Sequence, residues 1–212
     1  MMYLSRIELD TARRSTMRAL SMPNLLHGAV ESAFSGGRER RLWRLDTLRG
    51  RQYLLLVSAE QPSLSALDAQ FGTGTGWETR SYAPLLERIR EGSAWRFRLT
   101  ANPTVSLKAG KGPRGEVHAH ISPELQEKWL MDRAEKHGFA LEADQFGVVS
   151  NKWYSFRKHG ERRVSLLAVT YEGVLRVTDA ALFRRTLTEG IGRGKAYGMG
   201  LLTVMRAPEG GA

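Results

Sequence analysis

A histidine near the start of the chain is the best candidate for proton-transfer chemistry. His27 lies in the segment LLHGAVESAF, whose apolar residues recur at helical spacing after Pro23, with Asn24 in a plausible N-cap position. Because His27 directly follows Leu26, it lies about 100° around the helix from the apolar stripe and faces solvent or a cleft. Glu31, four residues further on, is close enough along the helix to orient the imidazole. An ordinary surface histidine fits the same spacing.

An imidazole that moves protons suffices for RNA cleavage, because the substrate's own 2′-hydroxyl is the nucleophile and no metal is required. The other histidines indicate less. His118 and His120 share one face of an extended segment, but the chain has no cysteine and no third ligand is signalled nearby. His137 is expected at a helix C-terminus, where a cation complements the helix dipole. We therefore predict neither a metal site nor a cofactor.

The glycine-rich run GIGRGKAYGMGLL, residues 190–202, is the most distinctive segment of the chain. It follows a predicted helix and precedes a predicted strand, the reverse of a dinucleotide fingerprint. Lys195 is followed by Ala196 instead of Ser or Thr, so the nucleotide P-loop pattern also fails. Two interpretations remain: a backbone that approaches a phosphate, with Arg193 and Lys195 adding charge, or a turn whose glycines need positive φ angles.

A second basic segment, WYSFRKHGERR, lies between two strand-like runs. A hairpin of this kind is suited to enter an RNA groove or to straddle its phosphates. Solvated cations that protect a sheet edge from aggregation explain the same residues. The candidate RNA-binding residues of this hairpin are Arg157, Lys158, Arg162 and Arg163.

The composition supports an anionic partner. The 212 residues include 32 Lys and Arg against 22 Asp and Glu, a formal charge of +10, which favours nucleic acid over a merely basic protein. The absence of cysteine excludes disulfides, thiolate zinc sites and cysteine nucleophiles, and it favours the reducing cytoplasm. The charged N-terminal segment predicts neither a signal peptide nor a membrane partner.

The pattern of apolar residues predicts an α+β protein of two tandem ferredoxin-like (RRM-like) βαββαβ domains with antiparallel sheets. In the first domain we expect a polar loop after the first strand, a helix that ends at Gly36-Gly37, a loop at FGTGTG and a closing strand at 95–101. Its remaining predicted elements are a strand at 3–9, a hairpin of 41–48 with 51–60, and helix candidates at 64–71 and 84–90.

The Gly- and Pro-rich stretch KAGKGPRG predicts a linker. The domains are therefore predicted at 1–107 and 122–212, with the linker at 108–121. In the second domain we expect two strands around a turn at Glu172-Gly173. Its other predicted elements are a helix from Ser122 to about Lys136, one or two strands within 139–156, a helix at 179–189 and a strand at 201–206.

Five segments, in this order and at these intervals, resemble the CRISPR-associated CasE family across nearly the whole chain. They are MYLSRIEL, LLHGAVESAF, FRLTANPT, VTYEGVLRVTD and GIGRGKAYGMGLL. The resemblance implies two ferredoxin-like domains and a metal-independent endoribonuclease that cuts repeat hairpins of precursor CRISPR RNA. It further implies that the protein stays bound to the RNA product as a subunit of the type I-E Cascade complex.

The resemblance also implies site residues. His27 matches the family's active-site histidine, and Lys195 matches the lysine of its glycine-rich loop, flanked here by Arg193 and Gly194 as RNA-binding residues. Some relatives carry a helper tyrosine three residues before the histidine, where this chain has Asn24. The hairpin from Arg157 to Arg163 matches the one that engages the RNA stem. The rival hypothesis is a non-catalytic subunit that binds an RNA hairpin and in which His27 is incidental.

Overall fold

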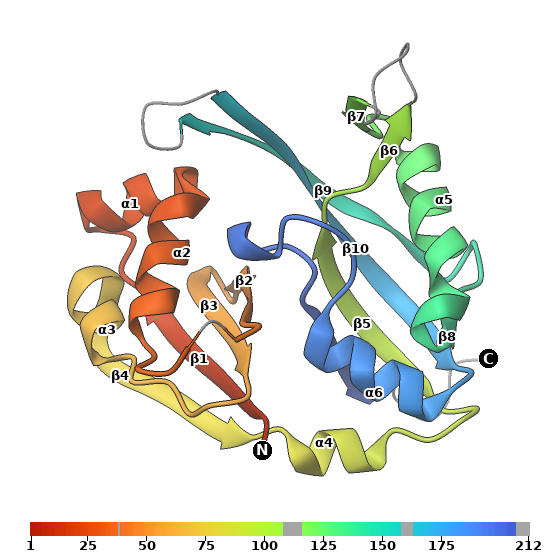
Figure 1. Ribbon diagram of the computed structural model, residues 1–212, viewed down its shortest axis with the longest axis horizontal. Coiled ribbons are helices and arrows are strands. Elements are labelled where there is room, and N and C mark those ends of the chain that lie inside the picture. The colour runs from red at the N-terminus through yellow and green to blue at the C-terminus, as the bar shows by residue number, and fades with distance from the viewer. Residues whose placement is uncertain (38, 108–115, 158–162, 207–212) are drawn as a thin grey trace.

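The computed structural model describes residues 1–37, 39–107, 116–157 and 163–206 and contains two antiparallel sheets that stand side by side (Figure 1). The first sheet has the strand order β2-β3-β1-β4, which is the order of a ferredoxin-like βαββαβ unit. Its elements are β1 (Tyr3–Leu9), α1 (Arg14–Ser21), α2 (Pro23–Ser32), β2 (Leu42–Leu48), β3 (Arg51–Ser58), α3 (Ser65–Phe71) and β4 (Gly72–Ser81).

The second sheet repeats this connectivity. Its order is β11-β5-β10-β8, with β9 also paired to β10. A short helix, α4 (Ala83–Arg88), joins the two sheets. The remaining elements are β5 (Ala94–Ala101), β6 (Thr104–Leu107), β7 (Glu116–Ala119), α5 (Pro123–Ala134), η1 (Glu135–His137), β8 (Phe139–Ala140), β9 (Phe146–Arg157), β10 (Arg163–Val177), α6 (Ala180–Glu189), η2 (Lys195–Tyr197) and β11 (Leu202–Arg206).

Local sequence accounts for several of these elements. Arg49 and Gly50 both have positive φ, 51° and 78°, as the tight turn of the predicted β2–β3 hairpin requires. Ser122 caps α5 by accepting a hydrogen bond from the Leu125 amide at 3.4 Å. In α2, Leu26 and Val30 are fully buried against the first sheet, which leaves the intervening face of the helix open.

The loops and helix ends of the first domain differ from the prediction. The expected polar loop contains α1, held in place because the Thr16 hydroxyl donates to the Phe71 carbonyl at 3.1 Å. The FGTGTG loop belongs to β4, an edge strand on which glycines are tolerated. Helix α2 ends at Ser32, before the two glycines, and its N-cap is Met22, with Asn24 inside the first turn. The hydrophobic pattern alone did not give these boundaries.

The strand at 95–101 does not close the first sheet. It is β5, paired with β10 and β11 in the second sheet, while β4 takes the closing position. Strict alternation identifies a strand but not its sheet. The chain passes from the first sheet to the second between Ser81, the end of β4, and Ala94, the start of β5. The predicted domain boundary at residue 107 therefore comes too late, because β5 already belongs to the second sheet. The described part of the predicted linker includes β7, which pairs with β6; residues 108–115 lie outside the described residues.

The predicted turn at Glu172-Gly173 is also absent, because β10 runs unbroken through both residues. Gly173 lies opposite Phe146 on β9 and Phe97 on β5. A Cβ atom on Gly173 would lie 2.4 Å from the Cα of Phe146, so glycine here permits a close approach between strands. The glycine that suggested a turn serves the interior of a sheet.

A buried arginine joins the two domains. The Arg44 side chain on β2 forms two hydrogen bonds with Asp46, at 2.8 and 2.6 Å, and is 1% exposed. It also donates to the Arg98 carbonyl on β5 at 2.7 Å and to the Leu201 carbonyl at 2.9 Å, both in the second domain. None of the described helices is long and apolar enough to cross a membrane.

Candidate active site

His27 lies on the open face of α2, beside the junction of the two domains. Its side chain is 38% exposed, so the ring is neither sealed in the core nor fully in water. Leu26 and Val30 fix the rotation of the helix by packing into the core. The predicted orientation of His27 is therefore present, and the imidazole is open to a ligand.

Glu31 and Arg41 form a fixed group on one side of the histidine. The Glu31 Oε1 atom lies 3.9 Å from His27 Nδ1, and Glu31 Oε2 accepts a 2.6 Å hydrogen bond from Arg41 Nη1. The Arg41 side chain is 4% exposed, lies over the Phe34 ring at 4.1 Å and also donates to the Gly37 carbonyl. A held carboxylate next to Nδ1 favours the tautomer that keeps the other ring nitrogen, Nε2, available.

Tyr197 borders His27 from the second domain. The two ring centroids are 6.3 Å apart in an edge-to-face arrangement. Tyr197 also contacts Phe156 of β9, with a centroid distance of 5.1 Å. The glycine-rich loop and the hairpin strand therefore meet α2 through one tyrosine.

The glycines of this loop have a structural function. Gly190, Gly192, Gly194, Gly198 and Gly200 all have φ between 72° and 92°, a region that favours glycine. A Cβ atom on Gly198 would lie 2.6 Å from the Trp43 ring. The positive-φ interpretation is confirmed, and the close packing places Tyr197 against the first domain.

Lys195 lies in the same loop, in a different electrostatic setting. Burial lowers the pKa of its ammonium, nearby Arg40 lowers this pKa further, and Glu189 opposes both effects. Gly194 is the residue before η2, and Arg193 forms an isolated bridge with Asn102. The loop thus supplies two cations, while Tyr197, not Lys195, contacts the His27 ring.

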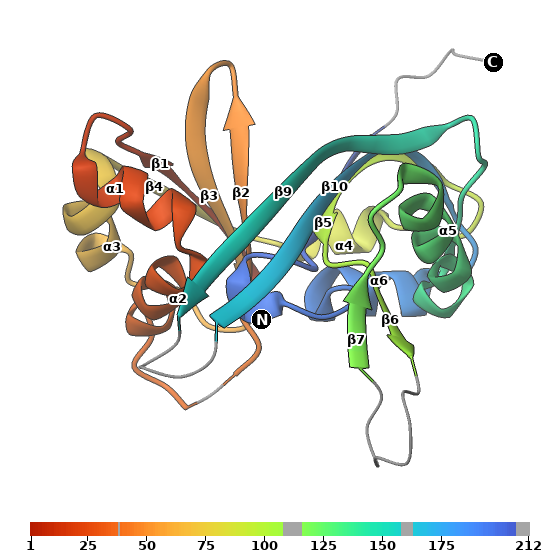
Figure 2. The same ribbon diagram turned by 90° about the horizontal axis from the view of Figure 1, so that it is seen from above.

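The long β9–β10 hairpin extends toward α2, as both views show (Figures 1 and 2). Arg157 and Arg163 pair at its described end and are exposed, and Arg163 Nε donates to the Ser155 hydroxyl at 2.6 Å. Lys158 and Arg162 lie outside the described residues. The described cations of the predicted hairpin therefore stand at its end nearest the His27 helix.

The remaining candidates are Asn24, close to His27 on α2, and two histidines elsewhere in the chain. Asn24 lies three residues before His27, on the same side of α2, and its Oδ1 is buried without a hydrogen-bond partner among the described residues. His118 pairs with Glu116 at 3.4 Å, and His137 bonds to the Thr186 hydroxyl at 3.0 Å. In the described part of the chain, no three His, Cys, Asp or Glu side chains gather in a way that would hold a metal.

Sequence reasoning missed Arg41 and Tyr197. Tyr197 was inside the segment already singled out, and an aromatic residue in a glycine-rich loop was a usable signal. Arg41 is ten residues from Glu31, across a turn, so no helical or strand spacing relates the two side chains.

Fold and site together define an α+β protein of two ferredoxin-like domains, with an accessible histidine where a basic hairpin and a glycine-rich loop converge. A family model described as CRISPR associated protein matches residues 2–206. The CRISPR-associated endoribonuclease Cse3 of Thermus thermophilus is 35% identical over 218 residues, 96% of this chain and 99% of that protein. The chain therefore belongs to this family of CRISPR-associated proteins, as the resemblance to CasE predicted.

Two solved structures agree with this assignment. Thermus thermophilus Cse3, bound to an RNA representing a pre-cleavage complex, superimposes with a TM-score of 0.81 at 31% identity, covering 96% of this chain and 98% of that one. Cas6e of Escherichia coli K-12 gives a TM-score of 0.71 at 21% identity, covering 97% of this chain and all of that one. The second comparison supports the fold.

Proposed function

We propose that this chain is an endoribonuclease that cuts the repeat hairpins of precursor CRISPR RNA, with His27 as the principal catalytic side chain. The observation that carries the proposal is the position of His27, half-exposed between the Glu31–Arg41 pair and Tyr197, where the basic hairpin reaches α2. The full-length similarity to a protein named an endoribonuclease supports the reaction class.

The proposed reaction needs no metal. The 2′-hydroxyl oxygen of the nucleotide before the cut attacks the phosphorus attached to the 3′-oxygen of the same ribose. The bond from this phosphorus to the 5′-oxygen of the next nucleotide then breaks. A base accepts the 2′-proton, and an acid donates a proton to the leaving 5′-oxygen. His27 carries out one of these transfers, and the products end in a 2′,3′-cyclic phosphate and a 5′-hydroxyl.

Substrate binding is assigned mainly to the second domain. Arg157 and Arg163, with Lys158 and Arg162, hold the phosphates of the RNA stem. Lys195, Arg193 and Gly194 lie near the scissile phosphate or its neighbour, and Asn24 adds a polar contact on α2. Glu31 is a positioning residue, because it acts on the RNA only through His27. The protein then stays on its product RNA as a Cascade subunit in the cytoplasm.

Cleavage of a repeat hairpin in excess chelator tests this function. We expect His27→Ala to slow single-turnover cleavage by about 10²- to 10⁴-fold, the range for a lost general acid or base, while RNA affinity stays unchanged. His118→Ala is the matched control, since that ring is 52% exposed and pairs with Glu116. Equal rates with and without the protein would instead establish a non-catalytic RNA-binding subunit. Cutting that stops in chelator would exclude the metal-free mechanism.

A further inference from the structure

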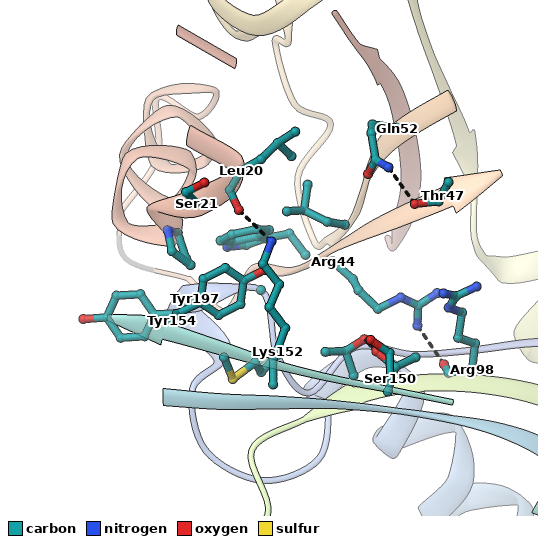
Figure 3. A pocket seen from close by; sticks show the side chains of 18 of the residues that line it. Leu20, Ser21, Arg44, Thr47, Gln52, Arg98, Ser150, Lys152, Tyr154 and Tyr197 are labelled. Atoms are coloured by element: carbon teal, nitrogen blue, oxygen red, sulfur yellow. Dashed lines mark hydrogen bonds between the residues drawn. The ribbon is translucent and has the colours of Figure 1, made fainter. Parts of the chain in front are cut away.

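A cleft of about 470 Å³ lies between the two domains (Figure 3). One wall comes from α1, the start of α2, and β2, and the other from β9, β10 and η2. Tyr197 links the cleft to the candidate active site, because its ring contacts His27 and also lines the cleft. The volume falls in the range of roughly 300–1,000 Å³ that is typical of small-ligand sites. A ligand here would lie one side chain away from the imidazole.

The lining has the chemistry of a site for a polar, anionic ligand with a flat body. Three cations, Lys152, Arg44 and Arg98, line the cleft, and none of the described lining residues is acidic. Aromatic surface comes from Tyr154 and Tyr197. Hydroxyl and amide groups that can bind the edge of a base are supplied by Thr11, Ser21, Thr47, Gln52, Ser150 and Thr170.

Lys152 is the cation best placed to meet a phosphate. Its ammonium donates to the Leu20 carbonyl at the end of α1, at 3.1 Å, and lies 4.7 Å from the centre of the Tyr154 ring. An ammonium has three donors, so this bond leaves two for a ligand. Arg44 is already hydrogen-bonded to Asp46, and Arg98 forms ion pairs with Asp46 and Glu172, so both contribute charge more than free donors.

Strand β9 connects the cleft to the basic hairpin. Ser150, Lys152 and Tyr154 line the cleft at alternate positions, Phe156 contacts Tyr197, and Arg157 stands at the described end of the strand. If the RNA stem is held at the Arg157 end of β9, the RNA reaches His27 first, and the single-stranded nucleotides that follow the stem then reach the cleft. What enters the cleft lies outside the stem.

We propose that this cleft binds one unpaired nucleotide of the substrate, the first beyond the scissile phosphate on the side away from the stem. The inference rests on the proposed function and deepens it, because it assigns a subsite to the same reaction. The base packs against Tyr197 and bonds to the hydroxyl-lined wall, and Lys152 neutralises the adjoining phosphate. Occupancy of the cleft holds the ribose of the scissile nucleotide beside His27.

An abasic substitution in the RNA tests the subsite in the wild-type protein. Removing only the base at the proposed position should weaken RNA binding by about tenfold, because the stacking of the base on an aromatic ring is lost. The matched control is RNA with the abasic site two nucleotides further from the stem, which should bind and react like intact RNA. Equal behaviour of all three RNAs, or equal losses at both positions, would overturn the proposal.

A protein variant gives the reciprocal test. Ser150→Phe places a ring in the cleft from an exposed strand position, whereas Asn151→Phe places the same ring on the opposite face of β9. We expect Ser150→Phe to bind intact and abasic RNA equally, and Asn151→Phe to keep the tenfold difference. A tenfold difference that persists in Ser150→Phe would contradict the site.

These outcomes are distinguishable from failure of the proposed function. If wild-type protein cuts intact RNA in a His27-dependent manner but does not discriminate the abasic RNA, only the cleft assignment is wrong. If intact RNA is not cut at all, the endoribonuclease proposal is wrong, and the binding comparison still decides whether the cleft takes a base.

Discussion

The two domains share one connectivity but differ in what they present at their junction. The first domain offers a compact helix, α2, on which Glu31, held by the buried Arg41 from outside the helix, flanks His27. The second offers long extensions, since β9 and β10 run 12 and 15 residues, and a glycine-rich loop reaches across to α2. The chemistry is thus concentrated on a short, rigid element, while binding is distributed over elements that extend beyond their own sheet.

This contrast has a physical reason. A proton transfer requires a fixed group within hydrogen-bond reach of one atom, which suits a helix whose rotation is set by its core. An RNA stem presents phosphates over a long surface, which suits an extended hairpin with cations along it. Variants of the two regions should therefore affect different quantities, and the predictions below follow the size of the expected effect.

The largest effect is expected on stability, at the Arg44–Asp46 contact that joins the two domains. Among the described residues, Arg44→Ala leaves Asp46, 4% exposed, with its weaker 3.4 Å contact to Arg98 as its one ion pair. Removing one partner of a buried ion pair costs roughly 3–5 kcal/mol in the free energy of unfolding. Urea unfolding measures this, and Arg44→Met/Asp46→Leu should recover part of the loss. A loss below about 1 kcal/mol would mean that Arg44 does not hold the domains together.

The next effect should be confined to the catalytic helix. Glu31→Gln keeps the size of the side chain but removes the charge held by Arg41, so His27 loses its electrostatic partner. We expect kcat to fall about tenfold, which corresponds to about 1.4 kcal/mol, with RNA affinity unchanged. Glu39→Gln, a nearby exposed carboxylate, is the control. A change in affinity with constant kcat would place Glu31 in RNA binding instead.

A smaller effect, on RNA affinity and not on the cleavage rate, is expected from the hairpin. Arg157→Gln and Arg163→Gln each remove one exposed cation. The slope of log affinity against log salt should decrease by about one for each variant, and the cleavage rate at saturating RNA should not change. Arg88→Gln on α4 should leave the slope as it is. If the saturated rate falls instead, the separation of chemistry and binding is wrong.

The smallest effect concerns stability in acid, at a histidine that lies on neither α2 nor the β9–β10 hairpin. Burial, and to a lesser degree Lys195 and Arg133, lowers the pKa of His137. A folded-state pKa below the unfolded value of about 6.5 means that the unfolded chain binds the proton more readily. The contribution to stability is therefore present above that value and is lost as pH falls through the folded pKa. His137→Gln should flatten this part of the urea-unfolding profile; an unchanged slope would contradict the shift.

Sequence patterns predicted local features well and pairings between distant segments poorly. The Arg49-Gly50 hairpin, the helix that begins at Ser122 and the open position of His27 depend on neighbouring residues and were all confirmed. The sheet to which β5 belongs depends on its pairing with β10 and β11, which come much later in the chain, so alternation within β5 did not reveal it.

The site shows the same limit. The sequence identified His27 and the loop that carries Tyr197, because both have distinctive local patterns. The Arg41–Glu31 contact, the packing of Gly198 against Trp43 and the cleft beside Tyr197 arise where separate elements meet. Only the three-dimensional structure brings these residues together.

A single 2′-deoxy sugar at the scissile nucleotide tests the central claim most directly, because it removes the attacking oxygen and leaves the rest of the RNA intact. The account predicts that wild-type protein binds this RNA with normal affinity and does not cut it, while the all-ribose RNA yields a 2′,3′-cyclic phosphate. Cleavage of the deoxy substrate at a comparable rate would show that the nucleophile does not come from the RNA.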